Sequence, residues 1–188
     1  MRELILGGQK SGKSRCAERR AAAWLAAPAR RAVLLATARE GDAEMRRRIE
    51  RHRRERAARV PGLATVEVPL ELARAVAAHA APDCLVVVDC LPLWLTNLMM
   101  PLEGSAPGPV DPLPACEGLC QALRAAPGPV VLVSNEIGLG VSPMSREARH
   151  FVDVLGGLHQ ALAALCSRVT LMVAGIEVPV KAATGGGQ

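Results

Sequence analysis

The sequence predicts an α/β fold with a mostly parallel, doubly wound sheet, and two features of the chain support this prediction. Short aliphatic runs, typical of buried strands, alternate along the chain with longer segments whose apolar residues recur at helical spacing. The glycine-rich segment 7–14 directly follows the first aliphatic run and directly precedes the first helical segment. A strand, a tight turn and a helix in this order are typical of the first unit of such a sheet.

The predicted strands are runs rich in valine, leucine and isoleucine. They are expected at residues 4–6, 32–37, 84–89, 130–134 and 169–173, with a weaker candidate at 65–68. Helices are expected between them, at residues 15–27, 42–59, 70–80, 92–100, 114–125 and 145–166. Because a helix that joins two strands of one sheet carries the chain back to its starting edge, most of these strands run parallel.

A chain of 188 residues is long enough to bury a sizeable core, and residues 1–188 are predicted to form a single domain. The proline- and glycine-rich stretch 101–114 is expected to be a surface loop rather than a domain boundary, because the strands on both sides of it are needed for one sheet.

No apolar run is long enough to span a bilayer, and the chain enters its first strand without a signal peptide, so a cytoplasmic protein is expected. The six cysteines show no metal-binding spacing and are expected to be reduced and mostly buried.

The segment 7–14 matches the pattern G-x-x-x-x-G-K-S of a P-loop, in which backbone N–H groups surround a polyphosphate. Lys13 is predicted to reach the β and γ phosphates, and the Ser14 hydroxyl is predicted to bind Mg²⁺. The sequence therefore predicts a nucleoside triphosphate as ligand, but the motif does not separate an ATPase from a kinase, a GTPase or a nucleotidyltransferase. The predicted phosphate-binding residues are Gly7, Gly8, Gln9, Lys10, Ser11, Gly12, Lys13 and Ser14.

Positive charge is concentrated in the predicted helix 42–59. The part from Arg46 to Arg59 carries eight arginines against Glu50 and Glu55, an excess larger than the net charge of +5 of the whole chain. Four interpretations are open: a solvated helix face, a nucleic-acid-binding patch, a disordered basic arm, or a lid that closes over phosphates. With one Phe, two Trp and no Tyr, the chain lacks the aromatic platforms on which single-stranded nucleic acids stack.

His52 lies within this basic helix. It shares a stripe with Met45 and Ile49 at helical spacing, which predicts a position at the inward edge of the helix. The surrounding arginines favour the neutral, nucleophilic form of its imidazole. Spacing alone nevertheless favours a hydrogen-bonded structural histidine over a catalytic one.

Small or polar residues end several predicted strands, at the edge of the sheet where ligands of open α/β folds collect. Ala36, Thr37 and Ala38 end the second strand, and Asp89 ends the run 84–89. An acid at the end of a buried strand is a typical Mg²⁺ partner of a P-loop. Glu136, which follows the run 130–134, is the alternative metal partner, and Asp89 is preferred.

Four segments of the chain together resemble one enzyme family. They are GGQKSGKS, ATAREGDAEMRRRIERHR, VVVDCLPLWLTNLM and VVLVSNEIGLGVSPMSREARHFVDVLGGLHQALA. These segments are similar to those of the bifunctional adenosylcobinamide kinase/adenosylcobinamide-phosphate guanylyltransferases of cobalamin biosynthesis. The resemblance runs from the first strand to about Lys181, and its most specific parts are R-I-x-x-H-R at residues 48–53 and N-E-x-G-x-G at residues 135–140.

The resemblance implies a RecA-like P-loop fold, a homotrimer and two reactions. The enzyme would phosphorylate adenosylcobinamide with ATP or GTP, and would then transfer GMP from GTP to adenosylcobinamide phosphate, giving adenosylcobinamide-GDP and pyrophosphate. The resemblance also makes His52 the nucleophile that becomes guanylylated, which reverses the preference from spacing, and it makes the basic helix a lid. The further nucleotide contacts that it implies are Ala36, Thr37, Ala38, Arg53, Arg54, Glu55, Arg56, Glu67 and Asp89.

The second class of function is a P-loop ATPase that grips a nucleic-acid backbone with the helix from Arg46 to Arg59. This alternative predicts salt-sensitive binding of DNA or RNA, and ATP hydrolysis that is indifferent to His52→Ala. The enzyme of the resembling family predicts the opposite, namely no nucleic-acid partner and a reaction that depends on His52.

Overall fold

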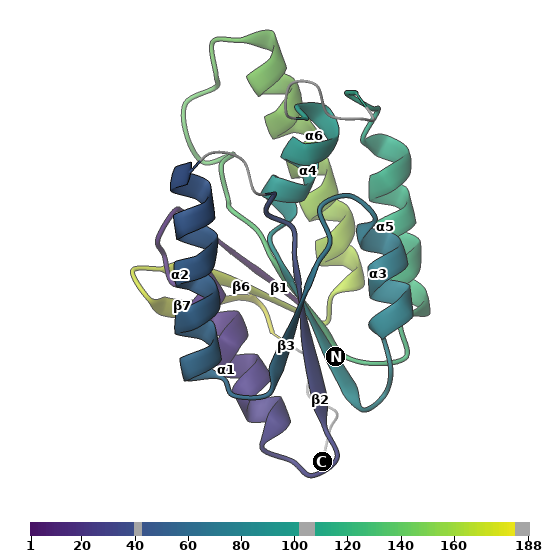
Figure 1. Ribbon diagram of the computed structural model, residues 1–188. Helices are drawn as coiled ribbons and strands as arrows, with labels where there is room; N and C mark the ends of the chain where they lie inside the picture. Colours follow the sequence, from purple (N-terminus) through teal and green to yellow (C-terminus); the bar gives the residue numbers. More distant parts are fainter. Residues whose placement is uncertain (40–42, 102–107, 183–188) are drawn as a thin grey trace.

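One seven-stranded sheet organises the chain in the computed structural model, which describes residues 1–39, 43–101 and 108–182 (Figure 1). The strand order is β3-β2-β4-β5-β1-β6-β7, and all neighbouring strands are parallel except β6 and β7. The predicted α/β fold with a mostly parallel sheet is therefore confirmed. The strands are β1 (Arg2–Gly7), β2 (Arg31–Ala36), β3 (Leu63–Glu67), β4 (Cys84–Asp89), β5 (Val130–Val133), β6 (Arg168–Val173) and β7 (Ile176–Lys181).

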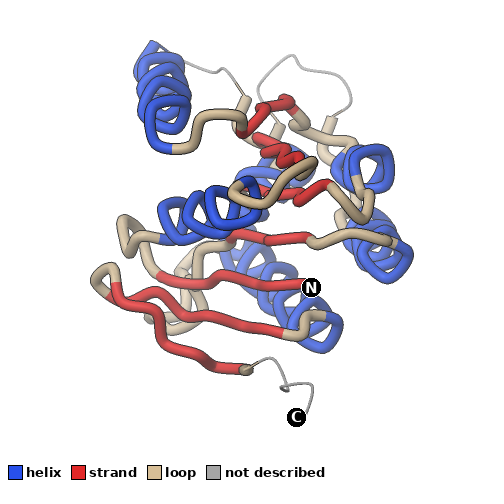
Figure 2. Tube along the Cα trace, turned by 90° about the horizontal axis from the view of Figure 1, so that it is seen from below, coloured by secondary structure: helices blue, strands red, loops and turns tan. Residues whose placement is uncertain are grey.

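Helices cover both faces of the sheet, but unequally (Figure 2). Four helices, α3 to α6, pack on one face, where their side chains form the larger core with Leu4, Val86 and Leu132. α1 packs on the other face, together with Val60 just after the end of α2. None of the described helices is long and apolar enough to cross a bilayer. The helices are α1 (Lys13–Leu25), α2 (Ala43–Arg59), α3 (Leu72–His79), α4 (Leu91–Met99), α5 (Leu113–Ala125) and α6 (Arg146–Leu165).

The alternation of side chains along β4 decides which face the end of this strand presents. Leu85 and Val87 belong to the smaller core under α1, whereas Val86 and Val88 belong to the larger core on the opposite face. Asp89, two residues after Val87, therefore points toward the face of α1. Only β5 separates β4 from β1, so the end of β4 lies near the start of α1.

The predicted strands and helices are confirmed, and within the described residues their ends shift by no more than two residues. The strand β7 was not predicted. It is an edge strand that pairs only with β6, and it contains Pro179, which cannot donate to a ladder. Asp42 of the predicted helix 42–59, residues 102–107 of the predicted surface loop and the tail 183–188 lie outside the described residues.

Cysteine side chains contribute to both cores, as the sequence predicts. Burial raises the pKa of Cys16, Cys116 and Cys166 to about 11. These thiols are therefore protonated at neutral pH and behave as small apolar side chains rather than as nucleophiles. The five buried cysteines are Cys16, Cys84, Cys116, Cys120 and Cys166.

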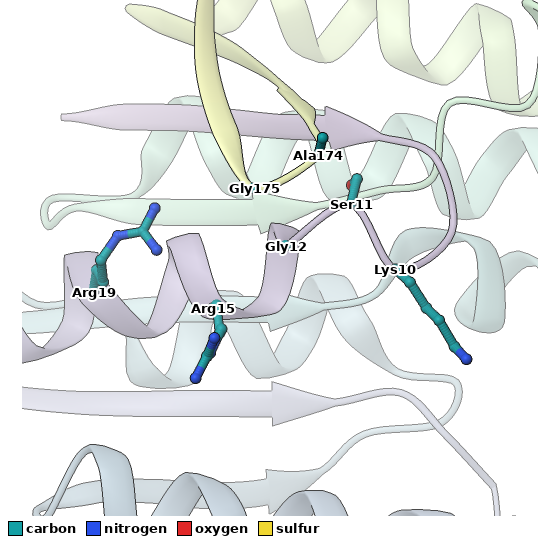
Figure 3. Close-up of a pocket in the computed structure, with 7 residues that line it drawn as sticks. All are labelled: Lys10, Ser11, Gly12, Arg15, Arg19, Ala174 and Gly175. Carbon is teal, nitrogen blue, oxygen red and sulfur yellow. The ribbon is translucent and has the colours of Figure 1, made fainter.

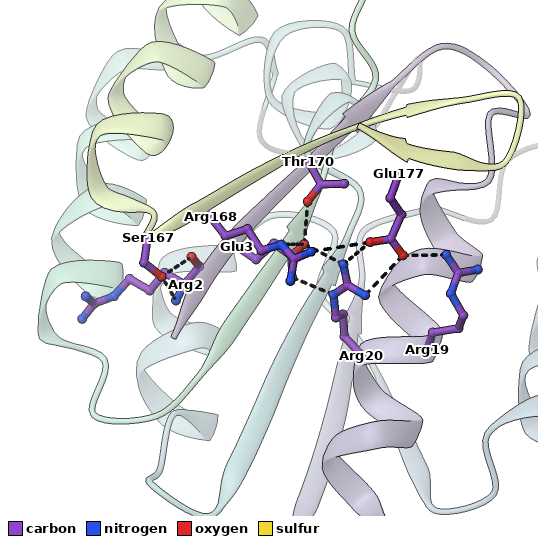
Figure 4. Close-up of polar contacts among 8 residues, drawn as sticks. All are labelled: Arg2, Glu3, Arg19, Arg20, Ser167, Arg168, Thr170 and Glu177. Atoms are coloured by element: carbon purple, nitrogen blue, oxygen red, sulfur yellow. Dashed lines mark hydrogen bonds and ion pairs between the residues drawn. The ribbon is translucent and has the colours of Figure 1, made fainter. Parts of the chain in front are cut away.

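A network of ion pairs joins α1 to β1, β6 and β7 (Figure 4). Glu3 is fully buried, and its carboxylate accepts hydrogen bonds from Arg20 at 2.9 and 3.1 Å and from the Thr170 hydroxyl at 2.8 Å. Glu177 of β7 accepts hydrogen bonds from Arg20 and Arg19, which lower the pKa of Glu177 to about 2. Because Arg20 serves both acids, the edge strand β7 is bonded to the centre of the sheet.

Candidate active site

The P-loop begins where β1 ends, at Gly7, and leads into α1, which begins at Lys13. Gly7 has a φ of 150° and Gly12 a φ of 100°, which residues with a Cβ rarely adopt. A Cβ on Gly7 would lie 2.5 Å from the carbonyl oxygen of Met172, so only glycine fits between the loop and β6. No side chain caps the first turn of α1, whose N–H groups and positive dipole end are therefore available for an anion.

Lys13 lies within the loop rather than at the surface. Its side chain is buried, and its Nζ donates a hydrogen bond to the carbonyl oxygen of Gly8 at 2.6 Å. Burial lowers the pKa of Lys13, and the nearby negative charges, including that of Asp89, act in the opposite direction. A phosphate held by the loop would give this ammonium group the anionic partner that its burial calls for.

Ser14 and Asp89, the predicted metal pair, lie together. The Ser14 side chain is close enough to the Asp89 carboxyl, at the end of β4, to lower its pKa. Burial raises the pKa of Asp89, whereas Ser14, Arg56 and a protonated His52 lower it. A hydroxyl, a carboxylate, phosphate oxygens and water are the ligands that Mg²⁺ takes beside a P-loop, so these residues fit the ion. Such a site needs no group of three ionisable ligands, and the described residues contain none.

The end of β2 is tied to the end of β4 by Thr37. This residue is fully buried, and its hydroxyl donates to the carbonyl oxygen of Cys90 at 2.7 Å and accepts from the N–H of Cys90 at 2.9 Å. Ala36 lies in register with Asp89, and Ala36 and Ala38 are partly exposed at this edge. The Thr37 hydroxyl is thus occupied by hydrogen bonds within the protein. A ligand at the end of β2 would contact the small side chains of Ala36 and Ala38 and the backbone.

Two arginines anchor the carboxyl-terminal end of α2. Arg59 donates hydrogen bonds of 2.7 and 3.0 Å to the carboxylate of Glu18, a buried residue of α1. Arg56 is buried as well, and its guanidinium donates to the Thr65 hydroxyl of β3 at 3.3 Å. Burial lowers the pKa of Arg56, and the charge of Asp89 opposes that effect. The helix is therefore fixed to both α1 and β3 beside the metal pair.

The other predicted contacts of α2 are exposed. Arg53 pairs with Glu67, the last residue of β3, so these two residues are brought together. Glu55 pairs with Arg59 at 3.3 Å, one helical turn further along. Arg54 makes no ion pair with any described residue, and neither does Arg56, whose guanidinium bonds to the Thr65 hydroxyl.

His52 is exposed on α2 and makes no hydrogen bond with the described residues. The structural role that spacing alone favoured is therefore not supported. Asp89, at the end of β4, is close enough to His52 for a protonated imidazole to lower the pKa of its carboxyl. Ile49 is partly exposed and the side chain of Met45 lies outside the described part of the chain, so the predicted apolar stripe stays a prediction. An exposed imidazole beside a phosphate-binding loop is available as a nucleophile.

A buried polar cluster behind the P-loop was missed by the sequence analysis. The Nε2 of His159 in α6 lies 2.7 Å from the Ser134 hydroxyl, and its Nδ1 lies 3.5 Å from a carboxylate oxygen of Glu136. Burial lowers the pKa of His159, and Glu136 acts in the opposite direction. The N–H of Glu136 donates to the carbonyl oxygen of Gly7 at 3.0 Å, so the cluster holds the segment after β5 against the P-loop. The sequence signal for this cluster is a single histidine on the core-facing stripe of α6.

The position of Glu136 also bears on the choice of the metal partner. Its carboxylate accepts a hydrogen bond from the N–H of Gly138 at 2.7 Å and faces His159, whereas Asp89 faces Ser14. Asp89 is therefore the better placed of the two acids.

A pocket of about 330 Å³ opens beside the P-loop, next to β6 (Figure 3). The turn between β6 and β7 forms one wall, and the N–H of Gly175 in this turn donates to the carbonyl oxygen of Ser11 at 2.9 Å. The first turns of α1 form the opposite wall. The residues that line the pocket are Lys10, Ser11, Gly12, Arg15, Arg19, Ala174 and Gly175.

The P-loop after β1, the acid at the end of β4 and the strand order define the class of the chain, which is that of the P-loop NTPases. Solved structures of this class share the fold. The flagellar accessory protein FlaH from Methanocaldococcus jannaschii is similar with a TM-score of 0.53 and 13% identity, over 100% of this chain and 81% of that chain. A KaiC-like protein from Pyrococcus horikoshii is similar with a TM-score of 0.51 and 16% identity, over 90% of this chain and 69% of that chain.

Sequence comparison gives the family. The family described as cobinamide kinase / cobinamide phosphate guanyltransferase, CobU, matches residues 3–180. The bifunctional adenosylcobalamin biosynthesis protein CobP of Pseudomonas aeruginosa is 46% identical over 187 residues, which cover 96% of this chain and 98% of the relative. CobU of Salmonella typhimurium is 36% identical over 186 residues, with 95% and 98% covered. The chain belongs to this enzyme family, and the resemblance drawn from its four segments is confirmed.

Proposed function

We propose that this protein catalyses two successive transfers at the carboxyl edge of its sheet. It phosphorylates the hydroxyl of adenosylcobinamide with ATP or GTP, and it then transfers GMP from GTP to adenosylcobinamide phosphate, giving adenosylcobinamide-GDP and pyrophosphate. The observation that carries the proposal is the position of His52. It lies on a helix that Arg59 anchors to α1, and it is near the Asp89 carboxyl at the end of β4.

In the guanylyl transfer, a ring nitrogen of His52 attacks the α-phosphorus of GTP. The bond between that phosphorus and the bridging oxygen to the β-phosphate breaks, and pyrophosphate leaves on the P-loop. A phosphate oxygen of adenosylcobinamide phosphate then attacks the same phosphorus, and the phosphorus–nitrogen bond breaks. Covalent catalysis of this kind replaces one difficult transfer by two easier ones. The basic helix α2 acts as a lid whose arginines stabilise the charge on the phosphates.

In the phosphoryl transfer, the P-loop and Lys13 hold the phosphates of the donor, and the acceptor hydroxyl attacks the γ-phosphorus. Catalysis of this reaction rests on positioning and on electrostatic stabilisation. Ser14 and Asp89 would hold Mg²⁺, which neutralises charge on the phosphate oxygens when it is bound. The remaining proposed nucleotide contacts surround the same edge: Ala36, Thr37, Ala38, Arg53, Arg54, Glu55, Arg56 and Glu67.

The family also implies an oligomeric state and a cellular location for the enzyme. We infer a homotrimer in the cytoplasm, on the strength of the family alone. The arginines of α2 serve the phosphates of small substrates, so no nucleic-acid partner is proposed.

Labelling with GTP tests the covalent step. Incubation with GTP labelled with ³²P at the α-phosphate and Mg²⁺ should leave acid-labile, alkali-stable label on the protein, and pyrophosphate should remove that label as GTP. His52→Ala and Lys13→Ala should carry no label. His150→Ala is the matched control, because His150 is an exposed histidine of α6, and it should be labelled like the wild type.

Two outcomes would contradict the proposal. Label that persists in His52→Ala would exclude this histidine as the nucleophile. An unlabelled wild type that binds DNA with strong salt dependence, and whose ATP hydrolysis is unaffected by His52→Ala, would favour the nucleic-acid-binding ATPase.

A further inference from the structure

A serine, a histidine and a glutamate meet behind the P-loop, and no step of the proposed reactions uses them so far. The Nε2 of His159 lies 2.7 Å from the Ser134 hydroxyl, and its Nδ1 lies 3.5 Å from a carboxylate oxygen of Glu136. The arrangement is like that of a serine nucleophile and its base, but a substrate has to reach a nucleophile. Ser134 is fully buried, whereas the side chain of Glu136 is partly exposed, so Glu136 is the member that a substrate can contact.

Two contacts hold the Glu136 carboxylate in place. A neutral imidazole that accepts a hydrogen bond from Ser134 at Nε2 carries its proton on Nδ1, the nitrogen that faces Glu136. Burial lowers the pKa of His159, which favours the neutral form, although Glu136 acts in the opposite direction. The other carboxylate oxygen accepts a hydrogen bond from the N–H of Gly138 at 2.7 Å. The carboxylate is therefore held by α6 on one side and by its own loop on the other.

The backbone of Glu136 lies at the start of the P-loop. Its N–H donates to the carbonyl oxygen of Gly7 at 3.0 Å, and the Nζ of Lys13 donates to the carbonyl oxygen of the next residue, Gly8, at 2.6 Å. Lys13 is the residue that is predicted to reach the β and γ phosphates. Glu136 therefore lies at the end of the loop where the γ-phosphate of a triphosphate is expected.

Three acids lie where the described strands β3, β4 and β5 end. Glu67 ends β3, at the outer edge of the sheet, and pairs with Arg53. Asp89 ends β4 and is the proposed metal partner together with Ser14. Glu136 follows β5, the strand beside β1. Of these three acids, Glu136 is the one left to serve a substrate at the γ-phosphate.

We propose that Glu136 takes the proton of the acceptor hydroxyl in the phosphoryl transfer, and that His159 is the residue that positions its carboxylate. The hydroxyl oxygen bonds to the γ-phosphorus, and the bond from this phosphorus to the oxygen that bridges to the β-phosphate breaks. The nucleoside diphosphate leaves with that bridging oxygen. The O–H bond of the acceptor breaks, and its proton passes to a carboxylate oxygen of Glu136, which later releases it to water.

This inference rests on the proposed function, and it separates the two reactions. Guanylyl transfer forms its bonds at the α-phosphorus, with a histidine and then a phosphate as nucleophile, so it has no hydroxyl to deprotonate. A defect at Glu136 or His159 should therefore appear in the phosphoryl transfer alone.

Rates of both reactions in one set of variants test the role of Glu136. Glu136→Gln keeps the shape of the side chain but removes the base, and should lower the kcat of phosphoryl transfer from ATP to adenosylcobinamide about 100-fold. The KM for ATP and the rate of guanylylation by GTP should each change less than about twofold, because the carboxylate contacts the acceptor hydroxyl alone. Glu147→Gln, at an exposed glutamate of α6, is the matched control and should leave both reactions unchanged.

Three variants test the role of His159. His159→Ala removes the contact with Glu136 and should lower the same kcat about tenfold. His159→Asn can keep an N–H donor near the place of Nδ1, on the side of Glu136, and should recover most of the rate. His159→Gln can keep one near the place of Nε2, on the side of Ser134, and should not. Urea unfolding shows whether each variant is folded, and Glu136→Gln tests the inference even where a His159 variant is not.

The outcomes separate this inference from the proposed function. If Glu136→Gln leaves the phosphoryl transfer unchanged, or lowers both reactions equally, Glu136 is not the base and the inference is wrong. Equal losses in His159→Asn and His159→Gln would show that His159 only fills space in the core, which overturns its positioning role. If the wild type transfers no phosphate to adenosylcobinamide, the kinase half of the proposed function fails, and the inference fails with it.

Discussion

Arginines serve two opposite purposes in the two regions where they gather. In the network under α1, Arg20 contacts both Glu3 and Glu177, and every charge has a partner within the protein (Figure 4). On α2, the exposed arginines Arg51 and Arg54 make no ion pair with the described residues. The same side chain therefore stabilises the fold in one region and supplies free positive charge in the other.

Arg59, which anchors α2 to α1, shares features with both groups of arginines. Arg59 is paired with the buried Glu18, as in the network, yet it belongs to the same helix as the exposed arginines. The position of an acid on a neighbouring element, rather than the arginine itself, therefore decides which purpose an arginine serves. Variants can test this distinction by measuring stability and guanylylation separately.

The largest effect is expected at the centre of the network. Glu3→Gln neutralises the buried carboxylate that pairs with Arg20. Removing one partner of a buried ion pair should lower the free energy of unfolding by about 3 kcal/mol. Urea unfolding measures this loss, and guanylylation of the folded protein should persist. Glu117→Gln, on the exposed face of α5, is the control and should change stability by less than about 0.5 kcal/mol. An unchanged stability of Glu3→Gln would show that the network does not hold the fold.

A smaller effect is expected at the anchor of α2. Arg59→Ala leaves Glu18 buried without its partner and should lower the free energy of unfolding by about 2 kcal/mol, together with the rate of guanylylation. Arg54→Ala, in the same helix, should lower guanylylation while the stability changes by less than about 0.5 kcal/mol. Urea unfolding and the ³²P label measure the two quantities. If Arg54→Ala destabilises the protein as much as Arg59→Ala, the distinction between paired and free arginines is lost.

The smallest effect is a dependence on pH at the edge strand, because Glu177 is partly exposed and solvent weakens its ion pairs. Arg20 and Arg19 lower the pKa of Glu177 to about 2, from its ordinary value of 4.5. A depressed folded-state pKa contributes stability that is complete above pH 4.5 and is lost as the pH falls toward 2. Glu177→Gln should therefore show a flatter decline of unfolding free energy than the wild type between pH 4.5 and 2. Parallel curves for the two proteins would argue against this ion pair.

Sequence could predict the parts of the site that depend on a local pattern or on the position of a residue at the end of a strand. The P-loop from Gly7 to Ser14 is a local pattern, and Asp89 follows from the rule that ligands gather where parallel strands end. Strand alternation then brings Asp89 to the face of Ser14, as the structure shows.

The parts that sequence could not predict depend on contacts across long stretches of chain. The pairing of Arg59 with Glu18 joins residues that are 41 positions apart, and the contact of His159 with Ser134 spans 25 positions. Neither pair has a spacing signal, because each is set by how helices pack on the sheet. The strand β7 was missed for a related reason, since its only sheet partner is β6 and most of its side chains are exposed.

The tight contact between Gly7 and β6 has a consequence for how this gene can vary. Gly7 has a positive φ, and a Cβ there would meet the carbonyl oxygen of Met172 at 2.5 Å. Every change in the first two bases of a glycine codon replaces the residue. Selection for a working phosphate loop should therefore leave this codon free to drift only at its third base, even where the surrounding codons change freely.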